Sequence, residues 1–147
     1  MKLFHQKGFT SIELMAVIGI ITILAAIGIP SYQTVRKNIV LNNYANEIVS
    51  MLRTAQNRSL SAQDGTPHGI FFEAEQYTIY GDDWSAPTYT TPFSLYNGIE
   101  ILQGVNSHIV FDRLLGTTDS DVIVKVGFPG GREKTITIDA IGKIALQ

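Results

Sequence analysis

The pattern of apolar positions divides the chain into three parts, and the first is an apolar run near the start. From Phe9 to Ile29 the only charged residue is Glu13. A helix of this length extends about 31 Å, which matches the hydrocarbon core of a bilayer. The pattern therefore predicts a membrane-spanning helix over residues 9–30.

The second part continues the helix with an amphipathic pattern. Residues 31–63 contain no glycine or proline, and Asp64-Gly65-Thr66-Pro67 should end the helix. At about 100° per residue, one set of apolar residues shares a face and a smaller set lies on the opposite face. The larger set is Leu41, Tyr44, Ala45, Ile48, Met51, Leu52, Ala55 and Ala62, and the smaller is Tyr32, Val35 and Ile39. We expect the larger set to pack under a globular domain of the same chain. The smaller set either contacts neighbouring helices or is scattered surface.

The third part, residues 64–147, has the short apolar runs and frequent turn residues of a β domain. Seven strands are expected, at 68–72, 76–80, 99–102, 108–112, 122–126, 134–139 and 143–146, with a long loop over 81–92. This spacing favours an antiparallel sheet or a two-sheet sandwich. The predicted fold class is therefore α+β, with one long N-terminal helix packed on an antiparallel β domain.

An ordinary signal peptide or a plain signal anchor would also begin with an apolar run. The run is longer than the 7–15 residues of a secretory core, and it leads into Ile29-Pro30-Ser31-Tyr32 without a convincing small-residue cleavage site. Neither alternative explains Glu13. A carboxylate in a membrane span costs a few kcal/mol at the helix centre, so it indicates a function by default.

At this point the sequence resembles the type IV pilins and type II secretion pseudopilins. That family has a short basic leader ending in glycine, followed by Phe-Thr-Leu-Ile-Glu, and this chain reads Gly8-Phe9-Thr10-Ser11-Ile12-Glu13. Ser11 replaces the usual leucine. Pro30 matches a proline that the family carries 21 residues after its first mature residue.

The resemblance implies a processing and assembly pathway. A prepilin peptidase would remove leader residues 1–8 by cutting between Gly8 and Phe9 on the cytoplasmic side, and the new Phe9 amine would be N-methylated. Glu13 would then pair with the Phe9 amine of a neighbouring subunit as helices pack into a filament. Pairing offsets much of the cost of placing each charge in a low dielectric. Pro30 is expected to kink or loosen the helix.

The same resemblance implies the partners and the location. The partners are the prepilin peptidase, other pilin or pseudopilin subunits, an inner-membrane assembly platform and membrane lipid. The subunit would cross the cytoplasmic membrane once, with its N-terminus inside and its β domain outside, before it joins an extracytoplasmic filament. Lys2 and Lys7 precede the span but Arg36 and Lys37 follow it, so the orientation comes from the leader and not from the positive-inside rule.

Looser matches favour the H-type minor pseudopilin and FimT group. They are the stretch Leu52–Ser59, Ile109–Asp112, Gly116, and the closing Ile136–Ile138 with Gly142–Ile144. Some FimT-type minor pilins bind DNA through arginines near a closing Gly-Arg-x-Arg. Here that stretch is Gly142-Lys143-Ile144-Ala145, which lacks the second arginine.

Composition narrows the function classes. Loss of Lys2 and Lys7 with the leader changes the formal net charge from −2 to −4, so we expect no nucleic-acid partner. The chain has no cysteine, and no nucleotide-binding or hydrolase motif is present. We therefore expect no enzyme activity, no cofactor and no metal. The aspartates at 82–83 and 119–121 are expected to form turns, and His68 and His108 are expected at the surface or at strand edges.

The preferred reading is a minor pseudopilin of a type II secretion or type IV pilus machine. The alternatives are a major pilin, a FimT-like subunit for DNA uptake, and an anchored β domain that binds a ligand without assembling. Four aromatic residues around the long loop, Trp84, Tyr89, Phe93 and Tyr96, form either a partner-binding patch or a cap on the core.

Overall fold

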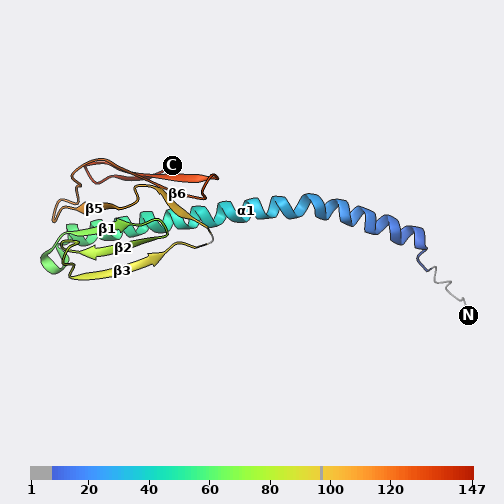
Figure 1. The fold of residues 1–147 in the computed structure, drawn as a ribbon, viewed down its shortest axis with the longest axis horizontal. Helices are drawn as coiled ribbons and strands as arrows, with labels where there is room; N and C mark the ends of the chain where they lie inside the picture. The colour runs from blue at the N-terminus through green and yellow to red at the C-terminus, as the bar shows by residue number, and fades with distance from the viewer. Residues whose placement is uncertain (1–7, 97) are drawn as a thin grey trace, which may run out of the picture. The chain divides into compact units, whose positions relative to one another are not determined.

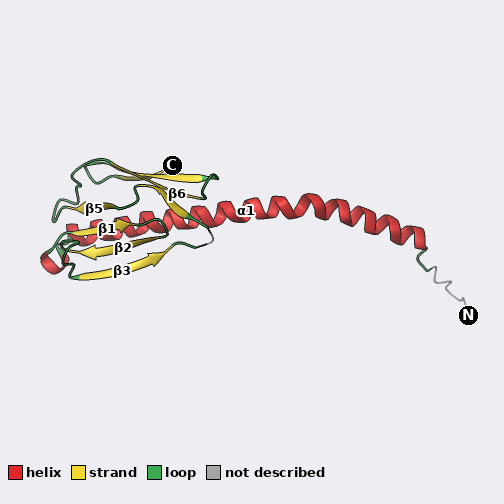
Figure 2. Cartoon of the chain, in the orientation of Figure 1, coloured by secondary structure: helices red, strands yellow, loops and turns green. Residues whose placement is uncertain are grey.

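The computed structural model describes residues 8–96 and 98–147, so the expected leader falls outside the described residues except for Gly8. The described chain begins with one long helix, α1 (Ser11–Leu60), followed by a short 3₁₀ turn, η1 (Gln63–Gly65), and eight strands (Figures 1 and 2). It divides into two compact units at Lys37, which are treated separately below.

In the first unit, α1 is helical through Pro30, so the proline does not end the helix, and the expected kink stays a prediction. The described apolar side chains of this segment are exposed, from Phe9 (88%) through Ile12 (75%) to Ile29 (59%). Within the described residues, α1 is the one helix long and apolar enough to cross a membrane, judged by length and composition. Nothing in the described chain covers this apolar surface.

The helix ends at Leu60, three residues earlier than predicted. Ala62, Asp64 and Gly65 have φ values of 49°, 59° and 72°, in the left-handed region that is incompatible with a continuing α-helix. Ala62 therefore lies beyond α1 and is not part of its buried face. The stop signals were recognised, but the chain leaves the helical conformation before it reaches them.

The β domain consists of two antiparallel four-stranded sheets, as Figure 1 shows in part. The first sheet has the order β3-β2-β1-β5 and the second β4-β6-β7-β8. The strands are β1 (His68–Phe72), β2 (Gln76–Gly81), β3 (Tyr89–Ser94), β4 (Glu100–Gln103), β5 (Ser107–Phe111), β6 (Val122–Gly127), β7 (Glu133–Ile138) and β8 (Ile144–Leu146). The α+β fold with antiparallel sheets is confirmed.

Strand β3 was missed, because most of it lies in the predicted loop 81–92. Pro92 argued against a strand, since proline cannot donate a ladder hydrogen bond. However, β3 is an edge strand that pairs only with β2, with Pro92 opposite Thr78. An edge strand tolerates a proline whose missing N–H would face outwards.

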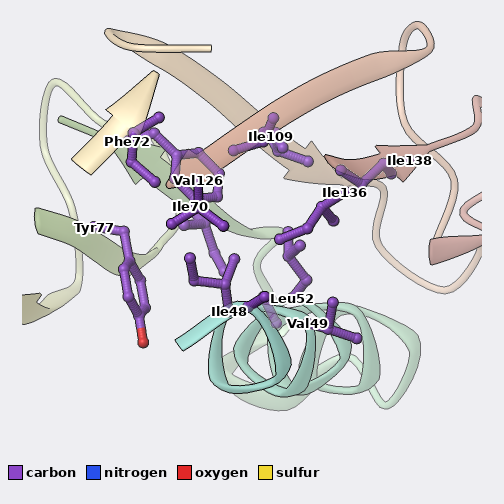
Figure 3. Packing of buried hydrophobic residues seen from close by; sticks show 14 of the residues in the cluster. Ile48, Val49, Leu52, Ile70, Phe72, Tyr77, Ile109, Val126, Ile136 and Ile138 are labelled. Carbon is purple, nitrogen blue, oxygen red and sulfur yellow. The ribbon is translucent and has the colours of Figure 1, made fainter. Parts of the chain in front are cut away.

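The core lies between the second half of α1 and the two sheets (Figure 3). On α1, Ala45, Ile48 and Leu52 are fully buried, as the helical pattern predicts. They pack in one cluster with residues from both sheets, including Ile70, Phe72, Ile109, Val126, Ile136 and Ile138. The opposite set, Tyr32, Val35 and Ile39, is exposed. The buried face is therefore confirmed, and exposed Ile39 agrees with an opposite face. Tyr32 and Val35 lie in the first unit, where the described side chains are exposed on every face, so their assignment stays a prediction.

His68 contradicts the prediction of a surface or edge position. Its side chain is fully buried, because residues 68, 70 and 72 share the core-facing side of β1. Neither ring nitrogen forms a hydrogen bond of ordinary geometry. Burial, and secondarily the charge of Arg58, lowers the pKa of His68, against smaller opposing effects of Asp64 and the Thr66 backbone.

Substitution of Ile48 and Ile39 by aspartate tests the two helix faces. In the fragment 31–147, Ile48→Asp should cost several kcal/mol of unfolding free energy, because it buries an unpaired charge. Ile39→Asp should change it by less than about 0.5 kcal/mol, since the side chain at this position is exposed. Urea unfolding followed by circular dichroism measures both. Equal destabilisation would disprove the two-face assignment.

The burial of His68 predicts a pH-dependent stability. Because the pKa is lower in the folded domain than in the unfolded chain, the unfolded chain binds the proton first as the pH falls. The contribution of neutral His68 to the free energy of unfolding is fully present above about pH 6.5 and decreases as the pH falls towards the lowered pKa. The total loss is about 1.4 kcal/mol for each unit by which the pKa of the folded domain lies below that of the unfolded chain.

The measurement is the unfolding free energy of the wild type and of His68→Leu between pH 5 and 8. The non-titrating variant serves as the control, since all other groups are shared. The wild type should lose stability relative to the variant on acidification, and a difference that does not change with pH would contradict the burial of a neutral imidazole.

Candidate functional site

The candidate site is the start of α1, where the sequence predicts processing and pairing. Gly8 and Phe9 precede the first helical residue, Ser11. A side chain added at Gly8 would meet no atom within 4 Å, so the described fold does not require a glycine there. Phe9 is 88% exposed. Both residues are accessible to a partner, which is what a recognition site at this junction needs.

Glu13 and Thr10 form a reciprocal cap on the helix. The Thr10 backbone N–H and hydroxyl donate to Glu13 Oε2 over 3.0 and 2.9 Å, and the Glu13 N–H donates to Thr10 Oγ1 over 3.3 Å. This arrangement is a capping box, which satisfies backbone donors that the first turn leaves unpaired. The spacing Thr-x-x-Glu is the known signature of this motif, so the cap could have been predicted from the sequence.

The cap leaves part of the carboxylate available. Both hydrogen bonds accepted by the Glu13 side chain end on Oε2, and within the described residues none ends on Oε1. The first turn also presents the positive end of the helix dipole, which favours an anion. Glu13 is thus held in place and can still accept a hydrogen bond from a cationic group outside the chain.

The residues that carry the looser resemblance form a second arrangement, at the other end of α1. The Gln56 amide donates to the backbone carbonyls of Gly116 (2.9 Å) and Gly142 (2.7 Å). A side chain at Gly142 would lie 2.1 Å from the Gly116 carbonyl oxygen, and Gly142 has a φ of 84°. These residues fix two loops to the helix, so their role in the chain is structural.

The aromatic residues around the predicted loop do not form one patch. Tyr89 packs near His68, Phe93 stacks on Tyr77, and Tyr96 is 63% exposed. Trp84 instead packs with Phe71, Tyr80 and His108. Tyr89 and Phe93 are partly buried and pack against the core, so the alternative of a cap on the core is confirmed for these two residues. Both lie on the same side of β3, because they are four residues apart in one strand.

The aspartates of the predicted turns make hydrogen bonds within the chain. Asp83 Oδ1 accepts from the Ser85 N–H at 2.9 Å, and Asp121 Oδ1 accepts from the Ala140 N–H at 2.7 Å. Within residues 8–96 and 98–147, no group of three or more histidine or acidic side chains is arranged to hold a metal ion.

Comparison with known proteins finds homologues among fimbrial proteins. The chain is 45% identical to prepilin peptidase-dependent protein D of Escherichia coli over 71 residues, which cover 44% of this chain and 48% of that protein. It is 41% identical to a fimbrial protein of Pseudomonas aeruginosa, over 40% of this chain and 38% of that protein. It is 49% identical to the type IV major fimbrial protein FimA of Dichelobacter nodosus, over 34% of this chain and 31% of that protein.

The similarity is partial. The chain spans less than half the length of each of these curated relatives. No family model matches the sequence, and no solved structure matches the fold. The relatives therefore support a link to type IV fimbrial proteins and do not identify the H-type pseudopilin and FimT group.

Proposed function

We propose that this protein is a pilin-type structural subunit, without enzyme activity, that polymerises through its N-terminal helix. A prepilin peptidase cuts between Gly8 and Phe9, and the new Phe9 amine is N-methylated. The helix anchors the subunit in the cytoplasmic membrane, with its N-terminus inside and the β domain outside. An inner-membrane platform then transfers it from the lipid into a filament.

The observation that carries this proposal is the uncovered apolar surface of α1, with one carboxylate at its start. From Phe9 to Ile29 the described apolar side chains are exposed, so they need lipid or other helices around them. Neighbouring copies of α1 supply such an environment. The fimbrial relatives, one of which is named for its dependence on prepilin peptidase, support the same reading.

Glu13 determines the register of the assembled helices under this proposal. In a bundle of apolar helices an unpaired carboxylate and an unpaired amine are each costly, and only one axial stagger brings them together. The Thr10 cap already orients Glu13 and leaves Oε1 for the Phe9 amine of a neighbour. Fewer side-chain rotamers then have to be ordered when the subunits meet.

The finer assignment is a minor pseudopilin of the H-type and FimT group, in a secretion pseudopilus or a type IV pilus. It is supported by the loose motifs in which Gln56, Gly116 and Gly142 occur, which the fold brings together. The net charge of −4 after leader removal does not favour a role in DNA uptake.

Processing is tested by intact mass. Protein co-expressed with a prepilin peptidase should lack residues 1–8 and carry one methyl group on Phe9. Gly8→Leu should block cleavage, because a bulky side chain should not fit the peptidase site that receives glycine. It should leave the fold unchanged, because a side chain at this position would meet no atom of the chain within 4 Å. A mature protein that retains Met1, or that begins beyond Ile29, would refute the proposal.

Assembly is tested with variants that separate capping from charge. Glu13→Gln keeps the cap, since glutamine also serves at this position of a capping box, but it removes the charge. Thr10→Val keeps the charge and removes the side-chain part of the cap. Glu13→Gln should be cleaved and inserted normally and incorporated at least about tenfold less than the wild type, if the lost pair is worth more than 1.4 kcal/mol.

The measurement is the ratio of subunit in sheared filaments to cleaved subunit in the membrane. Thr10→Val should retain most of its incorporation, and Glu13→Asp should be intermediate because its stem is shorter. If Glu13→Gln assembles normally, charge pairing is not the mechanism. If every variant, including the wild type, stays in the membrane as cleaved subunit, the chain is an anchored β domain and not a filament subunit.

A further inference from the structure

The outer face of the first sheet carries a pocket that lies outside residues 8–30, on which the filament proposal rests. Its volume is about 530 Å³, and it is lined by Pro67, Tyr80, Asp82, Asp83, Trp84, His108 and Val110. All of these residues belong to the β domain. A volume of this size is typical of small-ligand sites.

Gly69 allows the floor of the pocket to form. It pairs with Tyr80 on β2 and with Val110 on β5. A side chain at Gly69 would lie 2.7 Å from Tyr80 Cζ, so the Tyr80 ring can cross β1 only because this position is a glycine. The Tyr80 hydroxyl then reaches His108 Nδ1 on β5, at 3.3 Å.

Trp84 forms a wall of the pocket and is held by three other rings. Its ring lies 4.5 Å from Phe71, 5.1 Å from Tyr80 and 5.4 Å from His108, measured between centroids. It remains 37% exposed, so part of its surface is available to a ligand. Packing against these rings restricts the indole, so Trp84 holds this wall of the pocket in a defined position.

The charge of the pocket comes from Asp82 and Asp83, which are both exposed at its rim. Hydrogen bonding to Ser85, and to a smaller extent the charge of His108, lowers the pKa of Asp83. The Asp82 N–H donates to the Pro67 carbonyl at 2.8 Å, which fixes the loop. None of the described residues that line the pocket is a lysine or an arginine, and His108 is the one among them that can carry a positive charge.

From this geometry we propose that the pocket binds an organic cation, a guanidinium or alkylammonium group carried by a ligand or by the side chain of a partner protein. An aromatic face beside two carboxylates attracts such a cation through both the ring quadrupole and the charges. A metal ion would require more oxygen ligands than the two carboxylates supply. This binding is independent of filament assembly and goes beyond it.

Trp84 makes the site measurable in the full chain, because it is the only tryptophan. The protein in a neutral detergent is titrated with N-acetyl-argininamide or choline, and Trp84 fluorescence is recorded together with saturation-transfer NMR of the probe. The neutral counterparts are N-acetyl-citrullinamide and 3,3-dimethylbutanol, which have similar shapes without the charge. The cations should bind saturably, more weakly at high salt, and the neutral probes at least about fivefold more weakly.

Two isosteric substitutions remove only the charge. The first is Asp83→Asn, which keeps the side-chain oxygen that accepts from the Ser85 N–H. The second is Asp82→Asn, and asparagine tolerates the φ of 72° found at this position. Each should weaken cation binding about two- to fivefold, and the pair by roughly tenfold. The double variant Asp119→Asn with Asp121→Asn is the matched control, which removes two charges outside the pocket and should bind as the wild type does.

Comparison of the two probe arms identifies the source of the cation. Preference for the guanidinium probe over choline indicates an arginine side chain, and preference for choline indicates a quaternary ammonium ligand. The proposal is overturned if no cation gives a signal by either method, if the neutral probes bind equally well, or if the pocket variants bind like the control. None of these results affects the filament proposal, which rests on residues 8–30.

Discussion

The structure depends on one constraint, which is that a single helix carries two apolar surfaces with different needs. The stripe that contains Ala45, Ile48 and Leu52 is covered by the two sheets of the same chain. The segment from Phe9 to Ile29 is covered by nothing in the described chain. The first surface folds the β domain, and the second can be satisfied only by lipid or by other helices. The described chain therefore covers one of its two apolar surfaces itself and leaves the other exposed.

Under the proposed function, Glu13 at the start of α1 serves both the free and the assembled subunit. In the described chain, Glu13 caps its own helix through Thr10. This local role explains how a carboxylate in an apolar run is stabilised before any neighbour is present. The same contact restricts the rotamers of Glu13 and uses only one of its two carboxylate oxygens. Capping and intersubunit pairing are thus compatible, because they use different oxygens of one carboxylate.

The sequence predicted what depends on periodicity and on strong local signals. The helix, its buried stripe and the exposed set with Ile39 follow from a period of 3.6, and strand β1 was placed at its observed bounds because its turn residues are clear. Gly8, Phe9 and Glu13 were identified by a motif for cleavage by a peptidase and pairing with another subunit. The structure shows that these residues are exposed and that Glu13 caps the helix, and cleavage and pairing stay predictions.

Features that depend on tertiary contacts were not predicted. Strand β3 was missed because only sheet order shows that Pro92 lies on an edge, and His68 was misplaced because its burial requires knowing which face of β1 meets the core. The pocket beside Trp84 depends on Gly69, which lets a ring from β2 cross to β5. No local pattern contains that information, since the residues involved are up to about 40 positions apart.

The central claim is that the Phe9 amine of one subunit contacts Glu13 of another, and direct chemical crosslinking tests it. Filaments are assembled from a mixture of ¹⁴N- and ¹⁵N-labelled subunits and treated with an apolar carbodiimide, which joins a carboxylate to an adjacent primary or secondary amine. Pairing between subunits predicts a Phe9–Glu13 amide in peptides of mixed isotope label, present in filaments and absent from detergent-dispersed subunits. A crosslink found only within one subunit, or no crosslink in intact filaments, would contradict it.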